Sequence, residues 1–366
     1  HIPEEVIEKI AQAKRPTIWA GGGVLEAEAQ EELKEFAEMI GAAVVSGQSG
    51  KGALPENHPQ WIGHFATMPL TKELFEKSDL LISIGTKFRG NETGNGSVPL
   101  PEEHIGIDLN INAFNLNYPI TYGIVGDAKQ VLSQIVEELK EKNVSPDPEY
   151  VKEVETVRNE LRSQLRKAIH PYDEFVDAMR ETMPEDAILV RDITVPASLW
   201  GSRLFEIYQP RTNIYASGGG IGQGLPTAIG AQIADRDRVV VLMAGDGGFM
   251  LNVGEMATAT QEDLPIVILL FDDKGYGVLR GIQDDVYGRR VGVELFTPDF
   301  VELAKTMGFE AVRIKDSTEF RAELETAIAR RKPSMIVVDM NAVGPMAHRS
   351  KTAPDLMNNY IPRKRN

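Results

Sequence analysis

The sequence predicts an α/β protein built from two doubly wound parallel sheets. Two observations carry this prediction. Short apolar, β-branched runs alternate with stretches of helical period, and this alternation occurs in two blocks that a charged stretch separates. The length of 366 residues, at roughly 150 residues per domain, is that of two folded units.

The first block covers residues 1–141 and contains four strand-like runs: PTIWA, AAVVS, DLLISIG and EEHIGIDL. Such short apolar runs are typical of strands that a parallel sheet buries on both faces. Residues 26–40 and 127–142 have helical spacing, as Leu33, Phe36 and Ile40 show in the first. We therefore expect a Rossmann-like first domain over residues 1–141.

A change of composition at Lys142 marks the end of this domain. The segment NVSPDPEY is followed by VKEVETVRNELRSQLRKAI, a charged stretch of helical period with few apolar anchors. We expect a linker helix within residues 142–170.

The second block covers residues 171–345. Its strand-like runs are AILVRD, NIYA, VVVLMA, IVILLFD, AVRI and SMIVVDM, and helical stretches alternate with them. This order predicts a second open α/β sheet, whose ligands would bind beyond the carboxyl ends of its strands. Residues 346–366, which end in PRKRN, are expected to form a loosely attached tail.

The composition excludes several classes of protein. There are 39 Lys and Arg residues against 54 Asp and Glu, and the formal net charge of −15 repels nucleic acid and anionic lipid surfaces. There is no Cys, so disulfides, thiolate zinc sites and thiol nucleophiles are excluded. No apolar run reaches the length of about 18 residues that a membrane span needs. The acidic start HIPEEVIEKI differs from a signal peptide, so we expect a cytoplasmic protein.

Two loops of the second block place carboxylates directly after strands. Asp246 follows VVVLMA in GDGGF, and Asp272 and Asp273 follow IVILLF in DDKGYG. Oxygen ligands from two neighbouring strand ends suit magnesium, and Gly247 and Gly248 would let phosphate approach a helix N-terminus. Asp-Gly after a strand is also a common turn, so GDG alone is weak evidence.

A third loop, SGGGIGQGLP from Ser217 to Pro226, contains glycines that allow close approach of a ligand to the backbone. Other signals are weaker. GGGV at Gly21 lacks the third glycine of a dinucleotide fingerprint, and GKG at Gly50 lacks the hydroxyl residue of a phosphate loop, so both are interpreted as turns. The six His residues show no metal-binding spacing, and His58 and His64 are interpreted as loop or packing residues.

The run GDGGFMLNVGEMATATQEDLPIVILLFDDKGYG resembles the cofactor motif of thiamine-diphosphate enzymes, and SGGGIGQGLPTAIGAQIA resembles the segment before it. KRPTIWAGGGV, GKGALPENHP and SDLLISIGTKF resemble the central domain of the acetolactate synthase group. The resemblance covers nearly all of residues 1–345. It identifies residues 171–345 as a thiamine-diphosphate-binding domain.

The resemblance implies a role for each matching residue. Asp246, Asp273 and the Gly275 carbonyl would bind Mg2+, which holds the cofactor diphosphate. Gly247 and Gly248 would contact the diphosphate, and Thr194 would assist. In the glycine loop the carbonyl of Gly219, beside Gly220, would accept a hydrogen bond from the aminopyrimidine. Ile221 would support the bent cofactor, although a core isoleucine would also explain it.

The sequence departs from the family in two places. Asp272-Asp273 replaces a pair of Asn residues, which adds negative charge that Lys274 could offset; Asp272 could instead cap a turn. Secondly, no match is found to the domain that binds the aminopyrimidine and donates the activating Glu. No catalytic residue is therefore assigned, Glu255 matches an ordinary helix position, and we expect a fragment or a chain that a partner complements.

The activity implied by the resemblance is decarboxylation of a 2-oxo acid followed by carboligation, as in acetolactate synthases. A benzoylformate decarboxylase-like activity is the alternative, weakened by Asn91, which stands where that group has a pocket His. FAD stays open, because GTKFRGNETG matches the flavin loop only in part. The family implies a homodimer or homotetramer. A non-catalytic subunit and a nucleotide-binding module are the remaining alternatives.

Overall fold

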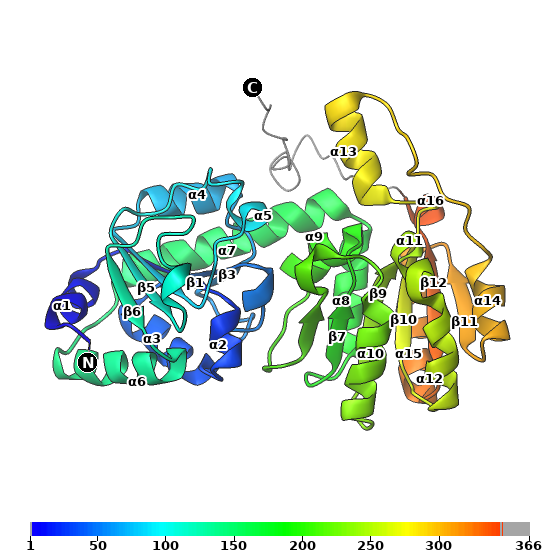
Figure 1. Cartoon of the computed structure of the whole chain (residues 1–366), viewed down its shortest axis with the longest axis horizontal. Helices are drawn as coiled ribbons and strands as arrows, with labels where there is room; N and C mark the ends of the chain where they lie inside the picture. The colour runs from blue at the N-terminus through cyan, green and yellow to red at the C-terminus, as the bar shows by residue number, and fades with distance from the viewer. Residues whose placement is uncertain (1, 345, 347–366) are drawn as a thin grey trace. The chain divides into compact units, whose positions relative to one another are not determined.

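The structure, a computed structural model, describes residues 2–344 and residue 346 of the chain (Figure 1). These residues form two compact units. Of the described residues, unit 1 comprises those up to Gln164 together with Glu206–Pro210, and unit 2 comprises Leu165–Phe205 and those from Arg211 onward. Apart from residue 346, the expected tail lies outside the described residues. Each unit contains a parallel sheet with helices packed against it, which confirms the predicted fold class.

The described part of unit 1 contains a six-stranded parallel sheet in the order β3-β2-β1-β4-β5-β6. Its strands are β1 (Pro16–Ala20), β2 (Ala43–Ser46), β3 (Trp61–Gly63), β4 (Leu80–Ile84), β5 (His104–Asp108) and β6 (Tyr122–Val125). The central strands β1, β2 and β4 are buried along their whole length. This is why the sequence shows them as continuous apolar runs.

Helices cover both faces of this sheet. On one face α1 (Glu4–Gln12), α3 (Gln30–Ile40) and α6 (Ala128–Glu141) pack on side chains such as Ile18 and Ile82. On the other face, α4 (Pro69–Glu76) places Phe75 against Trp19, with ring centroids 6.0 Å apart. The 22-residue helix α7 (Pro148–Ile169) contributes Tyr150, whose hydroxyl donates to the carbonyl of Pro16 over 3.1 Å.

The structure differs from the sequence prediction at three points in unit 1. The single helix expected over residues 26–40 is not formed. Instead α2 (Gly22–Glu26) ends at Glu26, and α3 begins only at Gln30. The edge strands β3 and β6 carried no clear sequence signal. The first has only three residues, and the second is not fully buried at any position. Edge strands of this kind lack the continuous apolar run of a central strand.

The described part of unit 2 contains a second six-stranded parallel sheet, in the order β11-β12-β10-β9-β7-β8. Its strands are β7 (Ile188–Arg191), β8 (Asn213–Tyr215), β9 (Val240–Gly245), β10 (Val267–Asp272), β11 (Glu310–Ile314) and β12 (Ser334–Asp339). All six correspond to runs read from the sequence. Strands β9 and β10 are neighbours, with Gly245 opposite Phe271. The residues that follow them therefore emerge side by side.

Two layers of helices bury this sheet. One face packs on α10 (Gly224–Ala234), α12 (Met256–Gln261) and α14 (Phe300–Thr306). The opposite face packs on α8 (Tyr172–Thr182), α9 (Val195–Arg203) and α15 (Ser317–Arg330), where Phe175 stacks on Phe320 and Trp200 lies against Phe271. Four further helical segments follow strands or lie near their ends: α11 (Asp246–Phe249), η4 (Met250–Glu255), α13 (Gly277–Tyr287) and α16 (Met340–Val343).

Within the described residues, no helix combines the length and the apolar character that crossing a membrane requires.

Candidate functional site

Asp246 begins helix α11 directly after β9, and its side chain is almost fully buried, at 1% exposure. One carboxylate oxygen accepts the backbone N–H of Gly247 over 2.8 Å. The other accepts the N–H of Gly275 over 2.9 Å. Asp246 therefore connects the two strand ends that the sequence singled out, although 29 residues of chain separate it from Gly275.

The loop after β10 has a conformation that requires glycine at position 275. A Cβ at Gly275 would lie 2.2 Å from the carbonyl oxygen of Val293, so no side chain fits there. Lys274 before it adopts a left-handed conformation, with φ of 64°. The N–H of Tyr276 donates to the carbonyl of Val293 over 2.9 Å. Close contact with the segment at Val293 thus fixes the loop that carries Asp273 and Gly275.

The carboxyl groups of Asp246 and Asp273 share a buried, negatively charged environment. Burial, and secondly the negative charge of Asp273, raises the pKa of Asp246 to about 7. Burial also raises the pKa of Asp273, although the positive charge of Arg280 opposes the shift. A buried carboxyl group whose ionised form is disfavoured by a neighbouring carboxylate is a suitable environment for a cation.

The extra negative charge of the Asp pair is compensated differently from the sequence prediction. Lys274 contacts Asp272, over 2.7 Å, and Arg313 reaches the same oxygen over 2.9 Å. Asp272 is the last residue of β10 and does not cap a turn, which corrects that interpretation. The cation beside Asp273 is Arg280, at 3.5 Å from its carboxylate and 2.7 Å from its carbonyl oxygen.

The glycine loop, residues 217–223, lies next to α11. Gly218, Gly219 and Gly222 have φ values of 69°, 79° and 86°, which other residues rarely adopt. Ile221 is 37% exposed, so it is not the core residue of the alternative interpretation. A Cβ built on Gly248 would be 3.5 Å from the Cβ of Ile221, so the side chain borders the start of α11.

The remaining predicted residues lie around the same strand end. Thr194 precedes α9, and its hydroxyl oxygen would be 2.8 Å from a Cβ at Gly245, the residue before Asp246. Gly247 faces the ring of Tyr276, because a Cβ there would be 2.7 Å from a ring carbon. The carbonyl of Gly220 accepts a hydrogen bond from the side chain of Gln223 over 3.0 Å. The structure therefore brings the predicted residues of unit 2 together.

Two residues at this site were missed by the sequence interpretation. Asp192, directly after β7, is buried and accepts the N–H groups of Gly222 and Gly224, each over 3.0 Å. Asn252 donates its side-chain amide to the carbonyl of Gly222 over 2.7 Å. A signal for Asp192 was present, because it follows a buried strand as Asp246 does. No local pattern distinguished Asn252.

The donor set fits magnesium better than a metal bound by many side chains. Among the described residues, no group of three or more His, Asp or Glu side chains is arranged to hold a metal ion. Mg2+ usually keeps several waters and needs only one or two carboxylates together with substrate phosphate. Asp246, Asp273 and the carbonyl of Gly275 meet this lower requirement.

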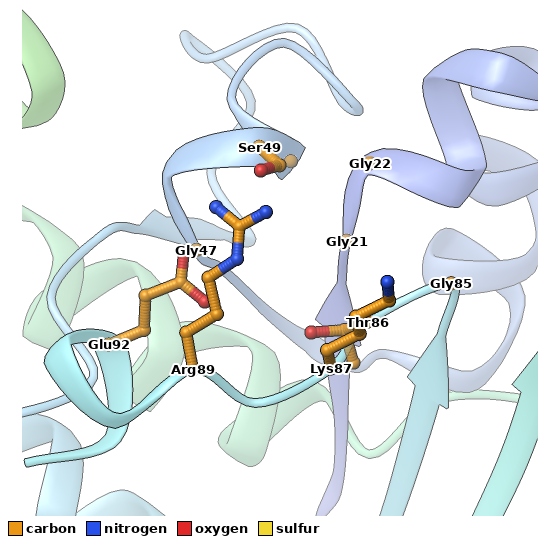
Figure 2. Close-up of a pocket in the computed structure, with 10 residues that line it drawn as sticks. Gly21, Gly22, Gly47, Ser49, Gly85, Thr86, Lys87, Arg89 and Glu92 are labelled. Carbon is orange, nitrogen blue, oxygen red and sulfur yellow. The ribbon is translucent and has the colours of Figure 1, made fainter. Parts of the chain in front are cut away.

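Unit 1 contains a cavity of about 190 Å³ at the carboxyl ends of β1, β2 and β4 (Figure 2). Gly21, Gly47 and Gly85, which follow these strands, line it. Figure 2 shows Arg89 reaching into it and the Glu92 carboxylate turned toward Gly47. Glu92 accepts the N–H of Gln48 over 2.8 Å. Burial raises its pKa, while this hydrogen bond opposes the shift.

Comparison with known proteins matches both units to one family. Residues 3–135 match the central domain of thiamine pyrophosphate enzymes, and residues 196–338 match the C-terminal TPP binding domain, thiamine pyrophosphate (TPP) being thiamine diphosphate.

Three curated relatives extend the comparison over most of the chain. The chain is 32% identical to a probable acetolactate synthase large subunit of Methanococcus aeolicus, over 91% of this chain and 59% of the relative. It is 34% identical to a protein of the same name from Methanocaldococcus jannaschii, over 92% of this chain and 60% of the relative. A probable 2-ketoarginine decarboxylase of Pseudomonas aeruginosa is 30% identical, over 90% and 58%. The chain thus spans less than two thirds of each relative's length.

The family matches cover the first sheet, the second sheet except β7 and the last residue of β12, and the loops after β9 and β10. This chain therefore belongs to the thiamine pyrophosphate enzymes, and contains their central domain and their C-terminal TPP-binding domain.

Proposed function

We propose that unit 2 binds thiamine diphosphate through Mg2+. Asp246, Asp273 and the carbonyl of Gly275 would hold the metal, and the N–H groups of Gly247 and Gly248 would bind the diphosphate. The observation that supports this most strongly is the hydrogen bond from Gly275 to Asp246, because it joins the two loops of the donor set.

The other predicted residues would orient the cofactor. Thr194 lies beside Gly245, close enough to assist diphosphate binding. In the glycine loop, the carbonyl of Gly219, beside Gly220, would accept a hydrogen bond from the aminopyrimidine. Ile221, which is exposed and borders α11, would support the cofactor in its bent conformation.

We infer that the working enzyme decarboxylates a 2-oxo acid and joins the product to a second carbonyl compound, as an acetolactate synthase does. Bound thiamine diphosphate supplies the electron sink, and the protein supplies orientation and electrostatics. Two of the relatives above are named acetolactate synthase large subunits, which favours this activity. The domain limits 1–141, 142–170 and 171–345 and the cytoplasmic location stay predictions from the sequence.

The activating Glu would come from a pyrimidine-binding domain, either in a longer form of this protein or in a partner chain. We expect a homodimer or homotetramer, and the name "large subunit" of the relatives favours a smaller companion. Light scattering of the chain alone tests the expected homo-oligomer. An increase in mass when a pyrimidine-binding domain is added tests whether a separate chain can supply that domain.

Isothermal titration of thiamine diphosphate into the chain, with and without Mg2+, tests the site. We expect magnesium-dependent binding that Asp246→Ala weakens at least about 100-fold, since the loss removes a metal ligand and the anchor of Gly275. Asp339→Asn is the matched control. Asp339 ends the adjacent strand β12 but only caps α16, through Asn341 and Ala342. Unchanged affinity of the Asp246 variant would refute the metal site.

A simple decarboxylase is the second candidate, favoured by the relative named a probable 2-ketoarginine decarboxylase. Product analysis with a supplied pyrimidine-binding domain separates the two activities. Carboligation gives a 2-hydroxy ketone, whereas simple decarboxylation gives an aldehyde. Neither product, with the cofactor bound, would favour the non-catalytic subunit.

The cavity of unit 1 favours a nucleotide ligand, with FAD the first to test. Ligands of open α/β sheets bind beyond the carboxyl ends of the strands where the strand order reverses, and β1 and β4 are such a pair. Arg89 could pair with a diphosphate, and Glu92 could accept from ribose hydroxyls. Titration of FAD with the chain, followed by flavin fluorescence, tests this proposal. Unchanged fluorescence on addition of the chain would reject FAD as the ligand.

A further inference from the structure

The glycine loop needs groups that hold its backbone: its own Gln223 binds Ser217 and Gly220, and other elements hold Gly222. Three of its seven residues, Gly218, Gly219 and Gly222, have positive φ. Glycine loses more conformational freedom on folding than any other residue, so such a loop samples many conformations unless other groups fix it. Fixing the peptide groups on both sides of a glycine is the direct way to do this.

Asp192 fixes the N–H of Gly222 in the loop and the N–H of Gly224 at the start of α10. Its two carboxylate oxygens lie 3.2 and 3.0 Å from the N–H of Gly222, and the second also accepts the N–H of Gly224 over 3.0 Å. The first oxygen accepts the N–H of Ile193 over 2.7 Å as well. Asp192 is 1% exposed, so its charge is stabilised mainly by these backbone donors.

The carbonyl of Gly222 is fixed from a different element. Asn252, in η4, donates its amide to this oxygen over 2.7 Å. There is no room for a side chain at Gly222, because a Cβ there would lie 2.9 Å from the Cβ of Leu251. Gly222 is therefore held through its N–H by the end of β7 and through its carbonyl by η4.

We infer that Asp192 and Asn252 are positioning residues that hold the glycine loop in the conformation that receives the aminopyrimidine end of thiamine diphosphate. This inference rests on the proposed function. Ile221 immediately precedes the clamped glycine, and its Cβ would be 3.5 Å from a Cβ on Gly248 in α11. Fixing Gly222 thus fixes where Ile221 and Gly219 stand relative to the N–H groups proposed to bind the diphosphate.

Two nearly isosteric substitutions remove one side of the clamp each. Asp192→Asn replaces one carboxylate oxygen by an NH2 group, which faces the N–H of Gly222 whichever way the amide is turned. Asn252→Asp turns a carboxylate toward the carbonyl of Gly222. Gln232→Leu is the matched control. Gln232 is buried and also binds backbone, but its partners are the carbonyls of Asp235, Arg236 and Arg238 after α10.

The experiment compares two ligands, thiamine diphosphate and inorganic diphosphate, each titrated with Mg2+ into the full chain. Both clamp variants should bind thiamine diphosphate at least about tenfold more weakly and inorganic diphosphate unchanged, because only the first ligand reaches the glycine loop. Hydrogen exchange of residues 217–224 should accelerate in both variants, whereas exchange of α11 should not. The Gln232 variant should show neither effect.

Three results would overturn the inference by separate routes. Clamp variants that keep the wild-type affinity for thiamine diphosphate and the wild-type exchange of the loop would refute the clamp alone. Equal weakening of both ligands would show a general structural role, which also refutes positioning. A wild-type chain that binds neither ligand would instead refute the proposed function, and the clamp's role with it.

Discussion

The two sheets of this chain have the same number of parallel strands but end in different residues. In unit 1 the strands β1, β2 and β4 are followed by Gly21, Gly47 and Gly85, which line a cavity. In unit 2 the strands β7 and β9 are followed by Asp192 and Asp246, and β10 ends at Asp272. One architecture thus supports two chemistries, because the residues at the strand ends, and not the sheet, decide what can bind.

The difference also concerns how each edge is held together. Unit 1 brings the loops after β1 and β4 together by direct backbone contact, since the N–H of Gly23 donates to the carbonyl of Gly85 over 3.1 Å, while the Glu92 carboxylate holds the loop after β2 at Gln48. Unit 2 brings its loops together through carboxylates that accept backbone N–H groups. Substitutions should therefore act by steric overlap in unit 1 and by charge in unit 2.

The largest expected effect is that of Gly21→Ala in unit 1. The new Cβ would lie 2.2 Å from the carbonyl oxygen of Gly85, and backbone cannot move away as a flexible side chain can. We expect a loss of about 3 kcal/mol in the free energy of unfolding of unit 1, measured by urea denaturation.

Gly230→Ala is the control for this substitution. Gly230 lies within α10, and nothing lies within 4 Å of its added Cβ. Alanine should therefore stabilise unit 2 by about 0.5–1 kcal/mol. Equal effects of the two substitutions would contradict the steric account.

The second effect is a pH dependence that Asp246 contributes in unit 2. Because burial and Asp273 raise the pKa of Asp246 to about 7 from 3.8, the folded protein keeps a proton that the unfolded chain releases between these pH values. The stability that this group contributes is thus complete below pH 3.8 and is lost as the pH rises to about 7.

For the metal-free protein, Asp246→Asn should remove from the stability profile a slope of at most about 1.4 kcal/mol per pH unit within this window. Urea denaturation of wild type and variant at several pH values measures it. Mg2+ should stabilise the wild type most at the upper end of this pH window, because the carboxyl groups that bind the metal must be deprotonated. Parallel profiles for the two proteins would disprove the raised pKa.

The smallest effect should come from Asp273→Asn, which restores the amide that the family carries. Loss of a buried negative charge beside Asp246 should stabilise the metal-free protein by about 1 kcal/mol. It should also weaken Mg2+ binding about tenfold, as titration with the metal alone would show. Asp284→Asn, which removes the negative charge that pairs with Arg290, is the control. Stronger metal binding by the Asp273 variant would contradict its role as a ligand.

Much of this protein could be predicted from local sequence. The central strands, most helices and the carboxylates after β9 and β10 are visible because burial on both faces demands continuous apolar runs. Asp192 carried the same signal as Asp246 but no glycine motif beside it. Its partners at Gly222 and Gly224 are 30 and 32 residues away, so no local pattern could show the contact.

The sequence by itself determined the α/β alternation, the family and the residues proposed to hold metal and diphosphate, because each is encoded in residues close together in the chain. Only the tertiary structure decided that Arg280 stands beside Asp273, while Lys274 and Arg313 pair with Asp272. It also decided the edge strands β3 and β6 of unit 1 and the clamp of Gly222. The physical reason is that charge compensation, edge pairing and loop fixation depend on which distant backbone and side-chain groups meet when the sheet forms.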